Sequence, residues 1–218
     1  YFRKGSAASH LSLADFNEAY FGSARHLHLS GVAAALSPTS YELSAYAAQW
    51  MRAHGKTVSF DPNLRPVLWR SEKEMVTQLN KLAFAADWVL PGMKEGRILT
   101  GFTTPEAVAD FYLDGGVKTV VIKTGEEGAY YKTAEGEKGV VPAVFVKNVV
   151  DTVGAGDGFA VGIISALLEG KTIKNAVARG NFIGARAIQV IGDSEGLPTK
   201  KALIAEMTMT QETTTVSA

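Results

Sequence analysis

Short apolar runs alternate along the chain with longer segments of helical periodicity, and this alternation limits the possible fold more than any other feature. The short runs predict strands and the periodic segments predict helices. Strands are expected at residues 26–31, 57–61, 88–91 and 119–123, and helices at 39–54, 71–86 and 105–113. Strands that alternate with helices form parallel sheets covered by helices. We therefore expect a doubly wound α/β fold with a mostly parallel sheet.

The second half of the chain predicts a hairpin followed by helices. Residues 128–132 and 138–147 carry β-branched and aromatic residues on either side of a turn-like Ala134-Glu135-Gly136-Glu137, which indicates a hairpin or meander at one sheet edge. Helices are then expected at about residues 156–168, 173–190 and 199–207. The Thr-rich end has little apolar surface to bury. We expect residues 1–208 to form one domain and residues 209–218 a disordered tail.

The composition argues against several classes of function. Lysine plus arginine equals aspartate plus glutamate at 22 residues each, and no basic stripe is interleaved with aromatic residues, so nucleic acid is not an expected partner. The sequence has no cysteine, which excludes thiolate catalysis and fits a cytoplasmic location. No apolar run approaches the roughly 20 residues of a membrane span. The histidines lack metal-ligand spacing with carboxylates and are assigned no role.

The segment Asp151-Thr152-Val153-Gly154-Ala155-Gly156-Asp157 connects a β-rich run to an apolar helical run. Glycine and alanine let backbone amides approach a ligand, and a helix that begins at Gly156 adds unpaired N–H groups and a positive dipole end. The segment therefore predicts a site for an anion such as a phosphoryl group. A tight turn with close helix packing explains the glycines equally well, and Asp157 alone is typical of a helix N-terminus.

The same segment resembles, without a break, the carboxy-terminal signature Asp-Thr-x-Gly-Ala-Gly-Asp of the ribokinase-like, or PfkB, carbohydrate kinases. The resemblance implies that Asp157 is the base that takes the proton from a sugar hydroxyl. It also implies that Gly154, Ala155 and Gly156 form the anion hole for the transferred phosphate, in agreement with the electrostatic demands of phosphoryl transfer. A Walker A ending is missing, and the glycines come too late for the Rossmann fingerprint of a dehydrogenase.

A second stretch, Phe60-Asp61-Pro62-Asn63-Leu64-Arg65-Pro66-Val67-Leu68-Trp69, follows a predicted strand at the edge where open α/β sheets bind ligands. With the opening Tyr1-Phe2-Arg3, it looks most like the 2-keto-3-deoxygluconate kinases and their fructokinase-like relatives within the family. The resemblance implies that Arg65 and Arg3 bind a sugar-acid carboxylate, to which a guanidinium fork is suited, and that Tyr1 contacts the sugar hydroxyls. The alternative for Arg65 is a pair with a surface carboxylate.

Two further segments resemble the parts of the family that border the nucleotide. Lys123, Thr124 and Gly125 follow a predicted strand and are implied as nucleotide contacts; without the resemblance they indicate a β-turn with a solvated lysine. Asn181 lies on the predicted helix that, by resemblance, lines the adenine pocket. The small residues around Asn181 are equally explained by close packing of helices.

The cation sites implied by the resemblance are less complete. Pro91-Gly92-Met93-Lys94-Glu95 keeps the glutamate of a family Asn-x-x-Glu motif, but Gly92 stands where asparagine is expected. The resemblance then implies that Glu95 orients hydrated Mg²⁺ through water rather than by direct ligation. It also places a K⁺ beside the anion hole, held by backbone carbonyls near Asp151, Val153 and residues 192–196.

The family's amino-terminal features are missing from this sequence. No glycine-rich sugar-binding segment and no small β lid precede Tyr1, and the first residues do not look like a signal peptide. We therefore expect an upstream part to be absent.

The expected function is ATP-dependent phosphoryl transfer to a hydroxyl of a keto-sugar acid, 2-keto-3-deoxygluconate by resemblance, with ATP and Mg²⁺ as cofactors. A fructokinase or another ribokinase-like kinase for a neutral sugar is the alternative among enzymes. A non-catalytic nucleotide-binding fragment is the alternative of another class, because a chain without its lid could bind ATP and fail to shield the sugar. The sequence leaves open whether the protein is a homo-oligomer.

Overall fold

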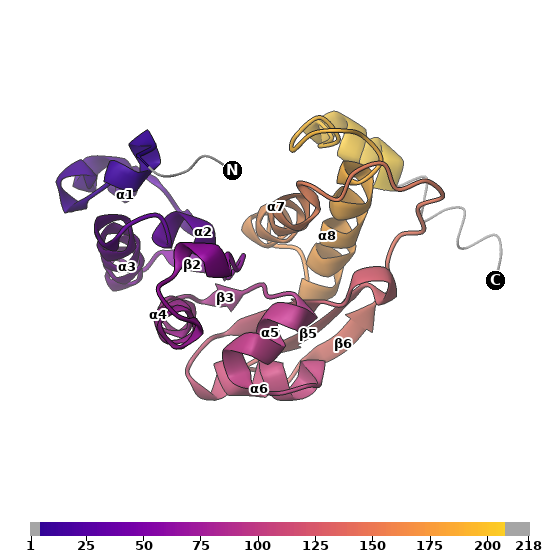
Figure 1. Cartoon of the computed structure of the whole chain (residues 1–218). Coiled ribbons are helices and arrows are strands. Elements are labelled where there is room, and N and C mark those ends of the chain that lie inside the picture. Colours follow the sequence, from indigo (N-terminus) through magenta and orange to yellow (C-terminus); the bar gives the residue numbers. More distant parts are fainter. Residues whose placement is uncertain (1–4, 208–218) are drawn as a thin grey trace. The chain divides into compact units, whose positions relative to one another are not determined.

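The computed structural model describes residues 5–207 (Figure 1). Within these residues the chain divides into two compact units. The first contains the chain up to Thr124 together with Tyr130–Lys138, and the second contains Gly125–Ala129 and the chain from Gly139 onward. The prediction of one domain over residues 1–208 stays a prediction. The predicted tail and the predicted contacts Tyr1 and Arg3 lie outside the described residues.

The sheet has six strands in the order β1-β2-β3-β4-β5-β6. They are β1 (His26–Ser30), β2 (Thr57–Asp61), β3 (Trp88–Val89), β4 (Thr119–Lys123), β5 (Ala129–Thr133) and β6 (Lys138–Val141). Strands β1 to β4 pair in parallel, and Ser59 of β2 lies opposite both His28 and Trp88. The predicted α/β architecture, a mostly parallel sheet flanked by helices, is confirmed.

Most of the predicted helices are found within a few residues of their expected ends. The α-helices are α1 (Glu18–Ser23), α2 (Gly31–Ala34), α3 (Pro38–Ala53), α4 (Glu72–Phe84), α5 (Met93–Thr100), α6 (Pro105–Asp114), α7 (Ala155–Leu168) and α8 (Ile173–Ala187). Residues 200–207 are also helical, and the 3₁₀ turns are η1 (Ala7–His10), η2 (Leu13–Asp15), η3 (Pro66–Leu68) and η4 (Gly125–Glu127). Side chains of Ser37, Ser71 and Thr104 cap α3, α4 and α6, as polar residues at helix starts commonly do.

Some predicted bounds were wrong. The strand expected at residues 138–147 ends at Val141, because the next residue, Pro142, has no N–H to donate to a neighbouring strand. Strand β3 ends at Val89, two residues early, and Pro91 again supplies no donor. The sequence analysis also missed α1, α2 and α5, which are short helices.

The core of the first unit lies between one face of the sheet and helices α3 to α6. Alternate residues of the strands supply the sheet side, including Val58, Phe60, Val120 and Ile122, which are all fully buried. Because side chains alternate between the faces of a strand, the residues between them point to the opposite face. That second face is polar along β1 and β2.

His26 on this polar face is a structural residue. Its ring nitrogens lie 2.8 Å from Thr57 Oγ1 and 2.8 Å from Ser59 Oγ, and its ring stacks on Trp88 at 4.7 Å between centroids. Burial, and secondarily the nearby His28, lower the pKa of His26 to about 4. The imidazole is therefore neutral at pH 7 and belongs to a hydrogen-bonded layer of the sheet.

In the second unit, α7 and α8 approach each other closely at glycines. A Cβ added at Gly162 of α7 would lie 2.6 Å from Gly180 Cα of α8, so the two backbones are in contact. At the far end of α7, Glu169 accepts hydrogen bonds from Arg179 at 2.8 Å and Lys200 at 3.0 Å, and these partners lower its pKa. None of the helices among residues 5–207 has the length and apolar character of a membrane span.

A close backbone contact also fixes the loop that follows β2. Gly31, the first residue of α2, approaches the carbonyl of Pro62 so closely that an added Cβ would lie 1.9 Å from Pro62 O. Such a distance is impossible for a real side chain, so only glycine allows the chain leaving β1 to pass the chain leaving β2. Gly31 therefore sets the position of the Asp61–Arg65 segment.

We predict that Gly31→Ala lowers the free energy of unfolding by about 3 kcal/mol, because backbone must move to admit the methyl group. Gly22→Ala is the matched control, since an added Cβ there has ordinary contact with Trp50 at 3.8 Å and alanine favours helix α1. Urea unfolding of both variants measures the difference. Equal stability of the two variants would contradict the close approach.

Candidate active site

The candidate anion loop lies in the second unit, where it leads into α7. Gly154 is the N-cap of α7 with φ 76°, a left-handed conformation that favours glycine, and an added Cβ would lie 2.3 Å from Asp193 O. The loop before it is tied down, because Val153 N donates to Asp151 Oδ1 at 3.0 Å and Val150 N donates to Ile188 O at 2.8 Å. The loop is thus held against the end of α8.

Helix α7 begins at Ala155, one residue earlier than predicted, and its first intrahelical bond runs from Gly158 N to Gly154 O at 2.8 Å. The N–H groups of the first turn have no acceptor within the helix, and they carry the positive end of its dipole. Asp157 lies in this first turn and is exposed. The geometry suits an anion with a carboxylate beside it, as the segment predicted.

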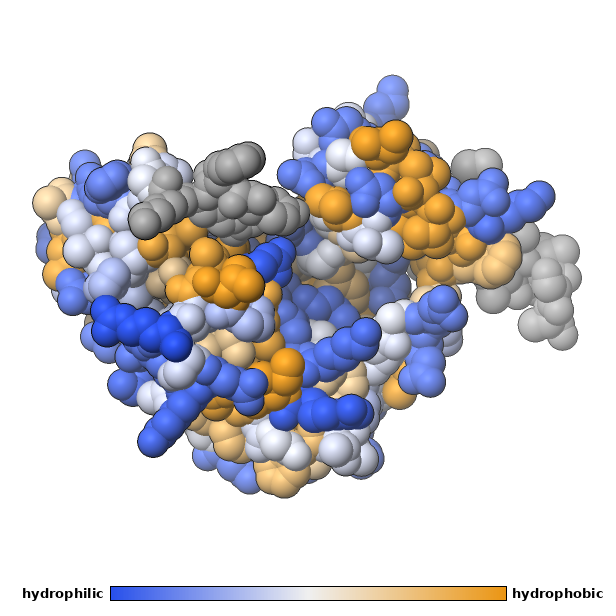
Figure 2. All heavy atoms as spheres, in the orientation of Figure 1, coloured by the Kyte–Doolittle hydropathy of each residue, from blue (hydrophilic) through white to orange (hydrophobic). Residues whose placement is uncertain are grey.

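Exposed apolar residues lie near this loop in the sequence. The exposed fractions of Phe145 and Ile191 are 89% and 78%, and Val149, Val150 and Val153 are also exposed. Figure 2 shows apolar side chains interspersed with polar ones on the face it presents. The segments on either side of the anion loop therefore carry exposed apolar side chains.

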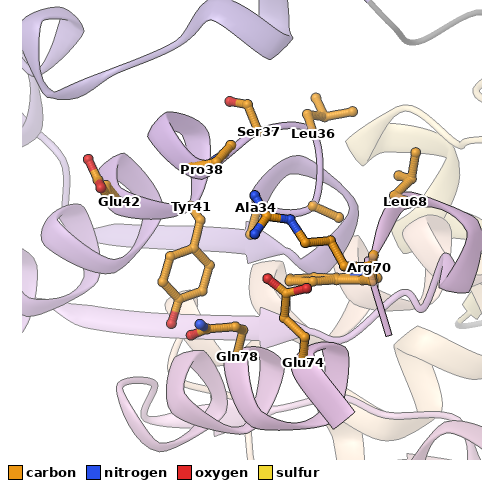
Figure 3. Close-up of a pocket in the computed structure, with 12 residues that line it drawn as sticks. Ala34, Leu36, Ser37, Pro38, Tyr41, Glu42, Leu68, Arg70, Glu74 and Gln78 are labelled. Atoms are coloured by element: carbon orange, nitrogen blue, oxygen red, sulfur yellow. The ribbon is translucent and has the colours of Figure 1, made fainter. Parts of the chain in front are cut away.

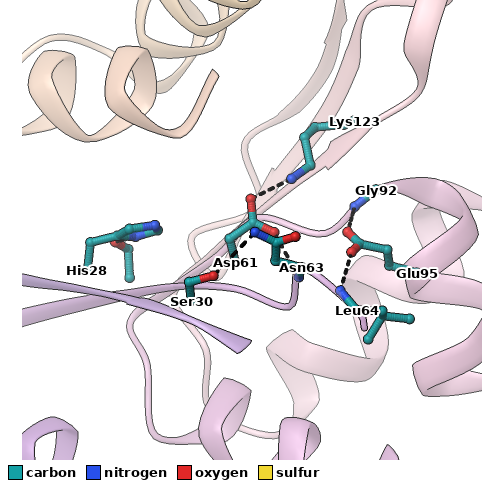
Figure 4. Close-up of polar contacts among 9 residues, drawn as sticks. His28, Ser30, Asp61, Asn63, Leu64, Gly92, Glu95 and Lys123 are labelled. Atoms are coloured by element: carbon teal, nitrogen blue, oxygen red, sulfur yellow. Dashed lines mark hydrogen bonds and ion pairs between the residues drawn. The ribbon is translucent and has the colours of Figure 1, made fainter. Parts of the chain in front are cut away.

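In the first unit, Asp61 is the centre of a group of polar contacts at the carboxyl ends of the strands (Figure 4). Asp61 ends β2 and is only 3% exposed. Its Oδ2 lies 2.6 Å from Lys123 Nζ, and its Oδ1 accepts a hydrogen bond from Asn63 N at 3.2 Å. Asn63 has φ 40°, which is rare outside glycine, and its amide donates to Ser30 Oγ at 3.3 Å. The sequence analysis missed Asp61, Asn63 and Ser30 as a group.

Glu95 joins the same group through backbone N–H groups. Its Oε2 accepts from Gly92 N, the N-cap of α5, at 2.7 Å, and its Oε1 accepts from Leu64 N at 2.9 Å. Gly92 has no side chain, so it offers no acceptor to the other N–H groups of the first turn of α5. Among the described residues, no cluster of three or more His, Asp or Glu side chains is arranged for a metal ion. The predicted role of Glu95 toward Mg²⁺ stays a prediction.

Arg65 directly follows Leu64 in the sequence, and its guanidinium has no acidic partner among the described residues. It precedes η3, its side chain is half-buried, and its Nη1 donates to Leu64 O at 2.8 Å. Within residues 5–207 no carboxylate lies at ion-pair distance from Arg65, so the alternative of a surface ion pair is not observed there. The guanidinium keeps donors for another acceptor.

The predicted nucleotide residues have different environments. Thr124 has a buried Oγ1 without a hydrogen-bond partner among the described residues, and Gly125 adopts φ 71° at the start of η4. Lys123 is held by Asp61 and is not the solvated lysine of the alternative interpretation. Asn181 is buried, and its amide donates to Val141 O and Pro142 O, both at 2.9 Å. These bonds use both amide hydrogens, which gives Asn181 a structural explanation.

A hollow of about 430 Å³ lies elsewhere in the first unit (Figure 3). Its polar lining includes Tyr41, Glu42, Arg70, Glu74 and Gln78. Gln78 Oε1 is buried without a partner in the described part of the chain, and burial raises the pKa of Tyr41. Among the described residues predicted for sugar or nucleotide, which are Arg65, Lys123, Thr124, Gly125 and Asn181, none lines this hollow.

Residues 1–200 match the family model described as pfkB family carbohydrate kinase. The chain belongs to this family. It is 51% identical over 203 residues to a 2-dehydro-3-deoxygluconokinase of Bacillus subtilis, which covers 93% of the chain. The resemblance based on the Asp151–Asp157 signature is confirmed at the level of family.

Solved structures of the family share the fold. The crystal structure of a PfkB protein from Polaromonas sp. JS666 is 54% identical, with a TM-score of 0.84 over 93% of this chain. A Vibrio cholerae fructokinase double mutant, bound to fructose, ADP and potassium ion, is 30% identical with a TM-score of 0.82 over 93% of this chain. The chain spans 62% of the Bacillus kinase, 64% of the Polaromonas chain and 66% of the Vibrio chain.

We predict that Glu95→Ala lowers the free energy of unfolding by about 1 to 3 kcal/mol, because the N–H groups of Gly92 and Leu64 both lose their acceptor. Lys94→Ala, an exposed neighbour in the same helix, is the control and should differ little from the parent protein. Chemical denaturation measures both variants. A Glu95→Ala protein of unchanged stability would show that the carboxylate does not hold these two segments together.

Proposed function

We propose that this chain is the nucleotide-binding and catalytic part of an ATP-dependent sugar kinase that phosphorylates a hydroxyl of a keto-sugar acid, 2-keto-3-deoxygluconate. The observation that carries the proposal is the start of α7. There, left-handed Gly154 leads into a helix of 14 residues whose first turn bears the exposed carboxylate of Asp157. The N–H groups of such a turn bind the oxygens of a phosphoryl group, and a carboxylate beside them accepts the proton of a sugar hydroxyl.

In this proposal Asp157 accepts the proton of the sugar hydroxyl as its oxygen attacks the γ-phosphorus of ATP. The new O–P bond forms while the bond to the β-phosphate oxygen breaks, and ADP leaves with that electron pair. The N–H groups at Gly154, Ala155 and Gly156 stabilise the charge that develops on the phosphoryl oxygens. The hydrogen bonds of the loop favour this role because they hold its donors in place before the reaction.

The remaining nucleotide contacts are proposed to come from Thr124 and Gly125, which follow β4. The unpartnered Thr124 hydroxyl and the left-handed Gly125 suit a polar ligand that approaches the backbone closely. Bound Mg²⁺ would neutralise charge between the phosphates, and Glu95 would act on it only through water. Asp193 O lies against Gly154, where backbone carbonyls could hold K⁺. The proposed partners are ATP and the small sugar acid, and the cysteine-free sequence favours the cytoplasm.

The substrate class rests on Arg65. Its guanidinium has no acidic partner within residues 5–207, and a planar fork of donors is suited to a carboxylate. The Bacillus relative is named as a kinase of such an acid, which supports the proposal. The Vibrio fructokinase supports the alternative of a neutral sugar.

We predict that Asp157→Asn reduces kcat by roughly 10²- to 10⁴-fold while ATP still binds, because a positioned base is lost and the backbone donors remain. Glu72→Gln is the matched control, since Glu72 is also an exposed carboxylate in the first turn of a helix. Steady-state ADP release and ATP titration calorimetry on the full-length protein measure the two effects. Full turnover in Asp157→Asn would exclude Asp157 as the base.

We also predict that Arg65→Ala weakens transition-state binding of 2-keto-3-deoxygluconate by about 2 to 4 kcal/mol and affects fructose far less, because only the acid loses a charged partner. Arg70→Ala, an exposed arginine five positions later, should leave kcat/KM for both sugars unchanged. The measurement is kcat/KM for 2-keto-3-deoxygluconate and for fructose in the parent protein and in both variants. An equal loss for both sugars would contradict the acid substrate.

A further inference from the structure

The segment Asp61–Leu64, called here the anchored segment, is held by residues of several other elements. Asp61 contacts Lys123, Asn63 contacts Ser30, and Leu64 contacts Glu95 (Figure 4). Gly31 adds the close backbone approach to Pro62 O. Each residue of the anchored segment therefore has a partner outside it.

The contact between Asp61 and Lys123 crosses the sheet. Strand β3 lies between β2 and β4 in the sheet order, and it ends at Val89, before the level of this ion pair. Lys123 N donates to Pro91 O at 2.9 Å, which keeps Lys123 aligned with the chain that leaves β3. The ion pair therefore fixes the end of β2 relative to a strand two positions away.

The anchored segment also holds a backbone conformation that would otherwise relax. Asn63 at φ 40° is costly for a residue with a side chain, and such a residue persists only where its surroundings hold it. Asp61 Oδ1 accepts the N–H of Asn63, while Asp61 Oδ2 is held by Lys123. Lys123 thus supports the turn that directs the chain toward Arg65.

Lys123 has little freedom to act elsewhere. The side chain of Asp61 is 4% exposed, and Lys123 is the cation at ion-pair distance from it among the described residues. If the ammonium moved to a nucleotide phosphate, a buried carboxylate would be left without its partner, which is strongly unfavourable. The contact argues against the nucleotide role that the family resemblance implied for Lys123.

We infer that Asp61 and Lys123 are positioning residues for Arg65, and that they act on the sugar-acid side of the reaction rather than on the nucleotide. This inference rests on the proposed function, because it assumes that Arg65 binds the substrate carboxylate. The ion pair and the left-handed turn hold the backbone from which the guanidinium extends. A small displacement of that backbone misaligns the guanidinium with the substrate.

The test compares Lys123→Met with Lys118→Met in the full-length protein. Lys118 is the matched control, because it pairs at 2.8 Å with Asp87, whose side chain is only 3% exposed, and Asp87 precedes β3 at the other end of the sheet. We expect Lys123→Met to raise KM for 2-keto-3-deoxygluconate by roughly 10- to 100-fold with KM for ATP changed less than about twofold. Lys118→Met should lower Tm and leave both KM values unchanged.

A double-mutant cycle with Arg65→Ala adds a measurement that a merely structural role would not change. If Lys123 acts through Arg65, Lys123→Met should cost little further activity in the Arg65→Ala background. Lys123→Arg should recover most of the affinity for the acid. Should Lys123→Met not fold, the pair Asp61→Asn with Lys123→Met removes both charges and provides the same comparison.

The outcomes separate this inference from the function on which it rests. No turnover of 2-keto-3-deoxygluconate by the parent protein would overturn both. Turnover by the parent protein with an unchanged sugar KM in Lys123→Met would overturn the positioning role alone. A rise in KM for ATP that persists in the Arg65→Ala background would show that Lys123 acts on the nucleotide, and it would overturn the positioning role.

Discussion

Backbone contact at glycine is the constraint on which the candidate functional segment of each unit depends. In the first unit Gly31 touches Pro62 O, and in the second Gly154 touches Asp193 O. A side chain at either position would push apart two backbone segments that carry the candidate chemistry. Catalysis of phosphoryl transfer depends on donors that are already in place when charge develops. Close backbone contacts at these glycines hold the neighbouring segments in place without using a side chain of the candidate site.

Ion pairs of buried carboxylates also fix the positions of backbone segments. Asp61 and Asp87 lie at opposite ends of the same sheet, and each is nearly buried and paired with one lysine. A buried carboxylate is stable only when its charge is compensated. At Asp87 the pair joins the ends of two strands. At Asp61 it also supports a strained turn, which is why we connect it with Arg65 and the substrate.

The sequence predicted the strands and long helices well because they depend on local patterns. Val58 and Phe60 alternate with polar residues, and serine or threonine caps mark the starts of α3, α4 and α6. Helix α5 was missed because it has only eight residues and its N-cap is Gly92, which carries no capping side chain. The pair of Asp61 and Lys123 could not be predicted, since 62 positions separate the two residues and only the sheet order brings them together. The hydrogen bonds from Asn181 to Val141 and Pro142 could not be predicted for the same reason, since these residues are also far apart in the sequence.

We propose that this member of the pfkB family, with its anion loop and Arg65, phosphorylates a keto-sugar acid. The most direct measurement is coupled ADP release by the full-length protein over a panel that contains 2-keto-3-deoxygluconate, fructose and ribose. We expect ADP release that requires the sugar, with kcat/KM for the keto acid at least about tenfold above that for the neutral sugars, a preference of roughly 1.4 kcal/mol in activation free energy. Higher kcat/KM for a neutral sugar, or no sugar-dependent ADP release, would contradict it.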